Sequence, residues 1–379
     1  MTTKHTEPLP TPRRAEFYAS ANSRAGFVGF FPELFSADRL QRLFILKGGP
    51  GTGKSTFMRA VADSVESYAR ARALQIDTTL YYCSSDIASL DGVALTNTAT
   101  GAGVAVIDGT APHTADPQYP GAFDCIVNLG EHWDDEKLAA HLLPIRTLCA
   151  GKAQCFKNSY RMLEAAAQAE DCVRTMYSRG LLYEKMQDSA ARFALKYLKA
   201  GEEGGFRLLS EYITSISAAG VHRLDAVISR APRIIAIRDR YMLGHQYLDL
   251  IIRHARALNQ PVIRFPSPLD IKITEGVLFE ATGELFITDA TGPLPSERVF
   301  KTINMERFVD HELAAQCRQR VRFFKKCSAE LLEGAVQQFA EAKELHARLE
   351  QIYTSCMDFE GEQRRREEIV GKIIGLLFG

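Results

Sequence analysis

The segment 42–56, RLFILKGGPGTGKST, constrains this chain more than any other stretch of its sequence. It begins with an apolar run typical of a buried strand, continues as a glycine-rich turn, and leads into a segment whose apolar residues have helical spacing. Gly48, Gly53, Lys54 and Ser55 satisfy the pattern G-x-x-x-x-G-K-S/T, the phosphate-binding loop or P-loop. The order strand, glycine loop, helix is what such a loop needs to present its N–H groups to a phosphate.

The residues of this loop have distinct physical roles in holding a triphosphate. Glycines let the backbone curl so that successive N–H groups point at the phosphate oxygens. Lys54 is predicted to neutralise the β and γ phosphates as a catalytic residue, and the Ser55 hydroxyl to bind Mg²⁺. Because no guanine-recognition pattern N/T-K-x-D occurs in the sequence, ATP is the expected nucleotide. The residues predicted to contact it are Gly48, Gly49, Pro50, Gly51, Thr52, Gly53, Lys54, Ser55 and Thr56.

A P-loop also needs an acidic residue, usually at the end of a second strand, to hold the metal. Residues 103–108, GVAVID, form an apolar run that ends in Asp108, so we expect Asp108 to complete the Mg²⁺ site with Ser55. The alternative is that Asp108 only caps the turn after the strand. Position 109 is glycine, so the glutamate that many ATPases carry directly after this aspartate is missing.

The second half of the chain resembles a diverged copy of the first, which a tandem duplication explains. The run that begins at Arg42 resembles the run that begins at Arg233, and the run that ends in Asp108 resembles the one that ends in Asp289. Because these two acids correspond, part of the role of Asp108 is expected to be structural. The second copy of the loop begins with Asp239 and carries bulky side chains, so only the first half is expected to bind a nucleotide.

Three polar residues of the first half are candidate catalytic residues. Asp86 is the first choice and Asp91 the second for orienting or deprotonating the attacking water. His113 is expected to contact the γ-phosphate or a neighbouring acid. Asp86 and His113 follow predicted strands, where open α/β sheets bind ligands, and they align with Leu269 and Leu294 of the second half. The alternative for each of the three is an ordinary solvated loop residue.

Long helical patterns follow each predicted sheet. Residues 134–177 and 312–354 space their apolar side chains as helical hairpin arms do, and packing within the chain is favoured over an exposed dimerisation arm. We predict a disordered tail, a P-loop NTPase domain with a helical arm, and a degenerate P-loop-like domain with long C-terminal helices. Their boundaries are residues 1–14, 15–200 and 206–379. The predicted fold class is therefore α/β, with two tandem P-loop NTPase-like domains, each a mostly parallel sheet with flanking helices.

The composition of the 379 residues excludes several classes of protein. Lysine and arginine number 46, as do aspartate and glutamate, and a net charge of zero argues against a protein that coats nucleic acid. With 46% hydrophobic residues but no apolar run typical of a membrane span or signal peptide, a cytoplasmic globular protein is expected. The eight cysteines form no C-x-x-C pair, so their spacing predicts neither a zinc site nor a disulfide framework.

Four motifs together resemble a family of bacterial two-domain P-loop proteins, described as ATPases or nucleotide-binding proteins. They are GFVGFF at 26–31, the P-loop, CSSDxxSLDGV at 83–93 and DGTAPH at 108–113. The resemblance implies that Asp86, Asp91 and His113 belong to the family's active-site pattern, as does the DPxYPG run that begins at Asp116. Typical members carry a second P-loop. This chain departs from them there, so a mechanism with two ATP molecules is not expected.

These observations predict a Mg²⁺-dependent ATP-binding protein, an ATPase with one active site in the first half. One alternative is a P-loop phosphotransferase that acts on a small metabolite or nucleoside, with Lys152, Lys157 or Arg161 closing over the acceptor. The other is an interaction protein that nucleotide switches through its helical arms. The expected ligands are ATP and Mg²⁺, with neither a membrane nor a nucleic acid as partner. The arms are the expected surface for a protein partner or for self-association.

Overall fold

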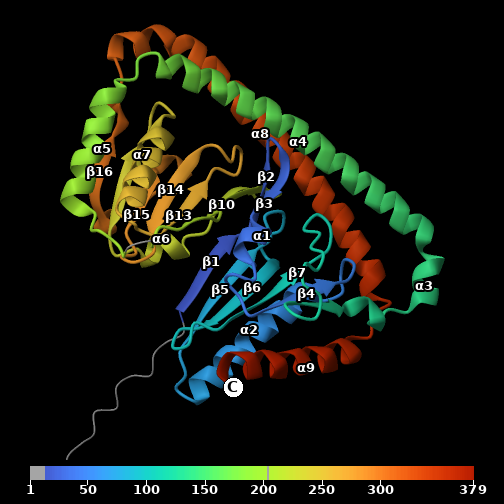
Figure 1. Cartoon of the computed structure of the whole chain (residues 1–379). Helices are drawn as coiled ribbons and strands as arrows, with labels where there is room; N and C mark the ends of the chain where they lie inside the picture. Colours follow the sequence, from blue (N-terminus) through green and yellow to red (C-terminus); the bar gives the residue numbers. More distant parts are fainter. Residues whose placement is uncertain (1–12, 203–204) are drawn as a thin grey trace, which may run out of the picture. The chain divides into compact units, whose positions relative to one another are not determined.

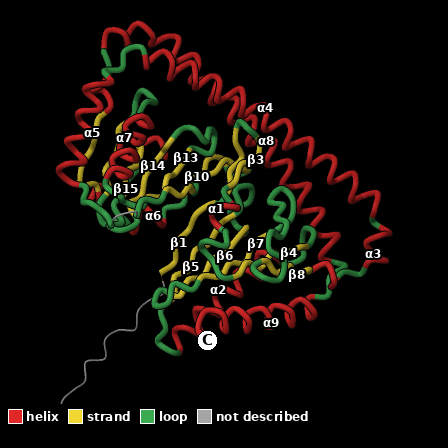
Figure 2. Tube along the Cα trace, in the orientation of Figure 1, coloured by secondary structure: helices red, strands yellow, loops and turns green. Residues whose placement is uncertain are grey.

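The computed structural model describes residues 13–202 and 205–379, which divide into two compact units. The first unit holds residues 13–19, 31–152 and 344–379, and the second holds residues 20–30 and 153–343. Each unit contains one six-stranded sheet with helices packed against it (Figure 1, Figure 2). Residues 1–12 of the predicted tail lie outside the described part of the chain, and Arg13 and Arg14 already belong to a strand.

The sheet of the first unit has the strand order β1-β5-β6-β7-β4-β8. Neighbouring strands are parallel except at β6, which runs antiparallel to both of its neighbours. Its strands are β1 Arg13–Tyr18, β4 Arg42–Lys47, β5 Ile76–Tyr82, β6 Leu90–Asn97, β7 Gly103–Asp108 and β8 Asp124–Asn128. The short helices of this unit are α1 Phe31–Leu34 and α3 Asp135–Ala140. Helix α2, Lys54–Ala71, buries Phe57, Val61 and Val65 on the sheet because these residues share one helical face.

The C-terminal helix α9, Phe359–Phe378, packs beside α2 in this first unit (Figure 1). Ile369, Ile373 and Leu377 recur every four residues, so they share one face, and all three are at most 2% exposed. Burial of each such side chain stabilises the fold by about 1.5–3 kcal/mol. The sequence-based division assigned this helix to residues 206–379. The structure divides the chain differently, because this apolar face completes the core of the first sheet.

The sheet of the second unit has the order β16-β12-β15-β14-β13-β9, with β14 as the one strand antiparallel to its neighbours. Its strands are β9 Leu208–Ser210, β12 Ile234–Arg238, β13 Val262–Pro266, β14 Thr274–Phe279, β15 Leu285–Thr288 and β16 Val299–Asn304. Helices α5 Tyr183–Tyr197 and α7 Gly244–Ala257 cover it, and α6 spans Ala226–Arg230. Two hairpins also belong to this unit, β2 Ser20–Ser23 with β3 Gly26–Gly29 and β10 Thr214–Ser217 with β11 Gly220–Arg223.

The two sheets correspond strand for strand in order and direction, with β4 matching β12 and β7 matching β15. The predicted α/β class with two mostly parallel sheets and flanking helices is therefore confirmed. The predicted tandem arrangement is compatible with this topology.

Two long helices, α4 Leu142–Ser178 and α8 His311–Thr354, each contribute residues to both units. Within the second unit they pack on each other through Phe156, Tyr160 and Phe339, whose ring centroids lie 5.6–6.3 Å apart. Neither these nor any other helix in residues 13–202 and 205–379 combines the length and the apolar character that crossing a bilayer requires.

Candidate functional site

The predicted P-loop is the connection between β4, which ends at Lys47, and α2, which begins at Lys54. Gly51 and Gly53 have φ angles of 69° and 81°, a backbone conformation that residues with side chains rarely adopt. Thr52 is buried, and its Oγ1 donates a hydrogen bond of 2.9 Å to the carbonyl of Gly49. Gly48, Gly49 and Pro50 are half-buried, whereas Thr56 is exposed on the first turn of α2. The loop is thus a tight curl that its own residues hold in shape.

The ammonium of Lys54 is held by this loop. Its Nζ donates hydrogen bonds of 2.9 Å to the carbonyl of Gly48 and 2.8 Å to that of Gly49. The same Nζ lies 3.7 Å from Oδ2 of Asp108, and both side chains are less than 15% exposed. An ammonium and a carboxylate therefore meet at the mouth of the loop, where little water screens them.

Asp108 reaches this position because β7 lies directly beside β4, with Asp108 paired to Leu46 in the register. Its Oδ1 accepts hydrogen bonds from the N–H and the hydroxyl of Thr110, at 2.8 and 2.6 Å. Its Oδ2 faces Lys54. One carboxylate oxygen thus caps the following turn and the other faces the loop. This geometry is compatible with both predicted roles of Asp108, the cap of the turn and the metal ligand. Ser55 lies on the first turn of α2, and its Oγ accepts a 3.0 Å hydrogen bond from the N–H of Leu90.

The predicted correspondence between Asp108 and Asp289 is wrong. Leu46 of β4 aligns with Ile237 of β12, and the partner of Ile237 on the next strand is Thr288. Threonine therefore occupies the position of Asp108 in the second sheet. Asp108 and Asp289 therefore do not share a structural role by position in the sheet.

Asp86 lies in the turn between β5 and β6, where its Oδ2 accepts a 2.8 Å hydrogen bond from the Ser89 hydroxyl. The predicted alignment of Asp86 with Leu269 is also wrong, by one residue. Tyr81 pairs with Gly92, and Phe265 pairs with Gly276, so Asp86 corresponds to Asp270. The carbonyls of both aspartates accept a bond from the N–H three residues later, at 2.9 Å in each case. The two halves therefore share an aspartate in this turn, and the predicted contrast with leucine does not distinguish the first half.

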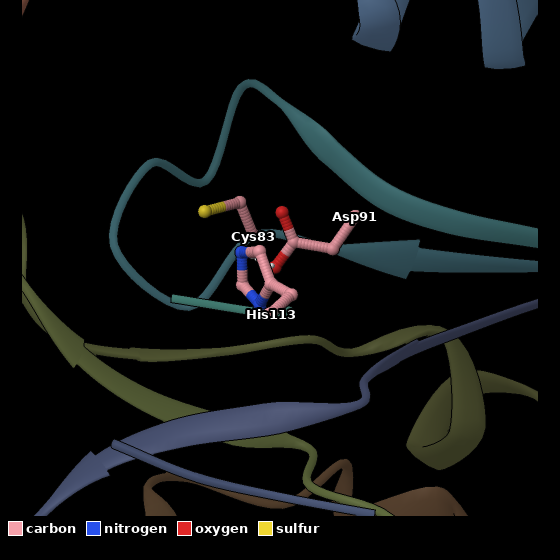
Figure 3. Close-up of side chains that lie close together, drawn as sticks. All are labelled: Cys83, Asp91 and His113. Atoms are coloured by element: carbon pink, nitrogen blue, oxygen red, sulfur yellow. Dashed lines mark ion pairs between the residues drawn. The ribbon is translucent and has the colours of Figure 1, made fainter. Parts of the chain in front are cut away.

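Asp91 and His113 are brought together, with the imidazole Nε2 3.3 Å from Oδ2 of Asp91 (Figure 3). Both are buried, and the thiol of Cys83 lies beside them. Burial lowers the pKa of His113, but the negative charge of Asp91 and the hydrogen bond with it outweigh burial and leave this pKa raised. Burial, with the charge of Asp91, raises the pKa of the Cys83 thiol. Neither Asp91 nor His113 is the solvated loop residue of the alternative prediction.

The end of α8 packs on the loop between β4 and α2, a contact within the first unit that the sequence did not indicate. A β-carbon added at Gly51 would lie 2.8 Å from the carbonyl oxygen of Glu350, and the Thr354 hydroxyl donates a 3.3 Å hydrogen bond to the Gly51 carbonyl. Gly49 faces two aromatic rings, Trp133 and Tyr353, whose centroids lie 5.7 Å apart. Glycine is therefore required at position 51 for two reasons, its positive φ angle and the close approach of the α8 backbone.

The same turns of α4 and α8 bring further basic groups near Lys54. Nζ of Lys152 lies 3.3 Å from Nδ1 of His346, and Nε2 of His346 lies 3.6 Å from the carboxylate of Glu350. Burial lowers the pKa of Lys152, and the ammonium of Lys54 lowers it further. Burial and the charges of Lys152 and Lys54 lower the pKa of His346 to about 4. Lys152 was expected only in the phosphotransferase alternative, and His346 was missed because nothing local marks a histidine 292 residues after the loop lysine.

Comparisons of the chain with family models, curated proteins and solved structures give no match. The second unit therefore offers the most direct comparison for the site. There the loop between β12 and α7 contains Asp239, whose carboxylate accepts bonds of 2.9 Å from the N–H of Leu243 and 2.6 Å from that of Gly244. An internal carboxylate thus occupies the first N–H groups of α7, which is the place a phosphate takes at a helix N-terminus. These N–H groups are thus paired within the chain, and that this half does not bind a nucleotide stays a prediction.

The two histidines near Lys54 are expected to titrate on opposite sides of their ordinary pKa of 6.5. His346 should titrate near 4 and His113 above 6.5 in a pH series of imidazole NMR spectra, assigned with His346→Gln and His113→Gln. Because the unfolded chain protonates His346 more readily, its share of the free energy of unfolding falls as the pH drops from 6.5 towards 4. The share of His113 is present below 6.5 and is lost as the pH rises through its raised pKa. Equal pKa values for the two residues would contradict both environments.

Proposed function

We propose that the first unit binds ATP with Mg²⁺ through residues 48–56 and hydrolyses it slowly. One observation carries the proposal: the curl between β4 and α2, with left-handed Gly51 and Gly53, holds the Lys54 ammonium 3.7 Å from the carboxylate of Asp108. A curled N–H cradle, a lysine and a strand-end aspartate are the parts that a triphosphate with its metal requires. The G-x-x-x-x-G-K-S/T pattern of this segment supports the same function.

The charges around the loop also favour a polyanionic ligand. Lys54 and Lys152 both lie in partly buried positions. The charge of Lys54 disfavours the charged form of Lys152, although less than burial does. A triphosphate that binds beside both would relieve this repulsion, which supports a nucleotide over a neutral metabolite as the ligand of this loop.

Each part of the loop has a separate role in binding the nucleotide and its metal. The N–H groups of residues 49–54 and the ammonium of Lys54 hold the β and γ phosphates. The Ser55 hydroxyl and the Asp108 carboxylate are oxygen donors of the kind that Mg²⁺ prefers, and they would hold the ion that neutralises phosphate charge. Asp86, a half-buried residue of the turn after β5, is the residue that we assign to orienting the attacking water.

The Asp108→Asn variant tests the metal part of this proposal. We expect its turnover of Mg·ATP, followed as phosphate release, to fall roughly 100-fold, because an amide does not neutralise the ion that the carboxylate holds. Asp135→Asn, a change of the same chemistry on the exposed face of α3, should leave turnover unchanged. Equal turnover in the two variants would remove Asp108 from the site.

The same assay separates the three activities that the sequence allows. An ATPase releases phosphate without an acceptor, whereas a phosphotransferase shows turnover that rises sharply when its acceptor is supplied. A nucleotide switch retains ATP with negligible turnover. Calorimetric titration with Mg·ATP provides the common test, and a protein that binds no nucleoside triphosphate in the presence of Mg²⁺ would overturn the proposal.

A further inference from the structure

Cys83, Asp91 and His113 form a compact cluster of three different donor groups in the first unit. One thiol, one carboxylate and one imidazole each offer an atom, and these atoms all lie within 4.8 Å of one another (Figure 3). The residues come from three separate segments: Cys83 directly follows β5, Asp91 is the second residue of β6, and His113 lies in the loop after β7. Asp91 and His113 are only 3% and 9% exposed.

A β-bulge explains why the acid faces this cluster. Along the β5–β6 ladder, Tyr81 pairs with Gly92 and the next residue, Tyr82, pairs with Leu90, so Asp91 is the extra residue. Bulges of this kind re-aim a side chain that the regular pleat would direct elsewhere. The N–H of Cys83 then donates a 3.0 Å hydrogen bond to the Ser89 carbonyl, which closes the turn with the thiol beside the bulge.

The second unit keeps the bulge and the acid but not the other two donors. There Phe265 pairs with Gly276 and Pro266 with Thr274, which leaves Glu275 in the position of Asp91. Ser267 takes the position of Cys83, and the Thr214 hydroxyl donates a 2.8 Å hydrogen bond to Glu275. Hydroxyl groups therefore satisfy the buried acid in the second unit. The fold needs neither a thiol nor an imidazole at this bulge, so Cys83 and His113 call for another explanation.

We propose that Cys83, Asp91 and His113 bind one divalent transition-metal ion of the zinc class. Thiolate, imidazole and carboxylate are the donors that Zn²⁺ takes in proteins, whereas Mg²⁺ takes oxygen donors, so this site is distinct from the pair Ser55 and Asp108. Three protein donors leave a fourth position of a tetrahedral ion for water or for an oxygen of another ligand. The sequence concealed the site because its donors lie in three separate segments of the chain and form no short cysteine motif.

Cobalt provides a probe for this proposal, because Co²⁺ bound to a thiolate has a charge-transfer absorption band that Co²⁺ bound only to oxygen and nitrogen lacks. The full-length protein, freed of metal with a chelator, is expected to show this band and to saturate at one Co²⁺ per chain. Cys83→Ser should abolish the band. The Cys83→Ser protein should also bind Zn²⁺ about 100-fold or more weakly in competition experiments. Even the loss of a residue that only hydrogen-bonds a metal ligand lowers metal affinity by about 10–100-fold, and here a ligand itself is lost.

Three further variants make the result decisive. Cys125→Ser removes a half-buried thiol on β8 outside the cluster and should leave the band intact. His113→Gln should weaken Co²⁺ binding as Cys83→Ser does, with circular dichroism showing that both proteins are folded. Lys54→Ala should keep the band while it loses nucleotide binding, so failure of the metal site and failure of the proposed ATP site are distinguishable. A native protein without the band, or a Cys83→Ser protein that retains it, would overturn the inference.

Discussion

Replacement of Lys54 by alanine is expected to weaken the binding of Mg·ATP by about 100-fold or more, as measured by calorimetric titration. The ammonium of Lys54 donates to two loop carbonyls, at 2.9 and 2.8 Å, from a side chain only 13% exposed, so its charge is already positioned for a phosphate. A charge-assisted hydrogen bond contributes about 1.5–3 kcal/mol, and the loss of one preorganised donor to a developing anion commonly lowers turnover 10²–10³-fold, so roughly that factor is expected here. Turnover should therefore fall along with affinity.

The control for this prediction is a lysine of the same unit that does not touch the loop. Lys137 lies on α3 with a side chain 67% exposed, and it pairs with the neighbouring Asp134. Lys137→Ala should bind Mg·ATP like the native protein. If Lys54→Ala also binds and hydrolyses ATP normally, the nucleotide assignment of this loop is wrong, whatever the topology around it.

Local signals in the sequence predicted the parts of the site that depend on neighbouring residues. The apolar run before Gly48, the glycines and the helical spacing after Lys54 specify strand, curl and helix within 15 residues, since each is a property of its own segment. The strand that ends in Asp108 was found in the same way. Its position beside β4 follows from the pairing of two apolar strands, which the sequence favours without specifying which strands are neighbours.

The remaining contacts depend on pairing over long distances in the chain, which periodicity does not encode. The alignment of the two halves assigned Asp86 to Leu269 because an alignment without structure has no way to fix one residue of offset, whereas the ladder between Tyr81 and Gly92 fixes it. The packing of α9 on the first sheet and of Tyr353 on Gly49 likewise joins residues about 300 positions apart. The apolar face of α9 was visible in the sequence, but not the core that it would complete.

Substitution of Gly51 by alanine is the second change for which we expect a large effect, on both stability and nucleotide binding. Gly51 has a φ of 69°, which costs a residue with a side chain about 1–2 kcal/mol. An added β-carbon would also lie 2.8 Å from the Glu350 carbonyl oxygen and 2.6 Å from the Thr354 hydroxyl, a collision with α8 that costs a further 1–3 kcal/mol, roughly. Because the curl and the end of α8 cannot both keep their positions, the affinity for Mg·ATP should fall with stability.

Gly101→Ala separates the two costs, because the chain offers a glycine with the same backbone and free space around it. Gly101 lies in the turn between β6 and β7 with a φ of 75°, and an added β-carbon would meet nothing within 4 Å. Urea unfolding of both variants should show the dihedral cost in each and the larger loss only in Gly51→Ala, whereas Gly101→Ala should bind Mg·ATP normally. Equal losses in the two variants would mean that α8 does not pack on the loop. The close approach at Gly51 would then be absent from the protein in solution, and with it the packing of α8 that brings His346 under the influence of the Lys54 charge.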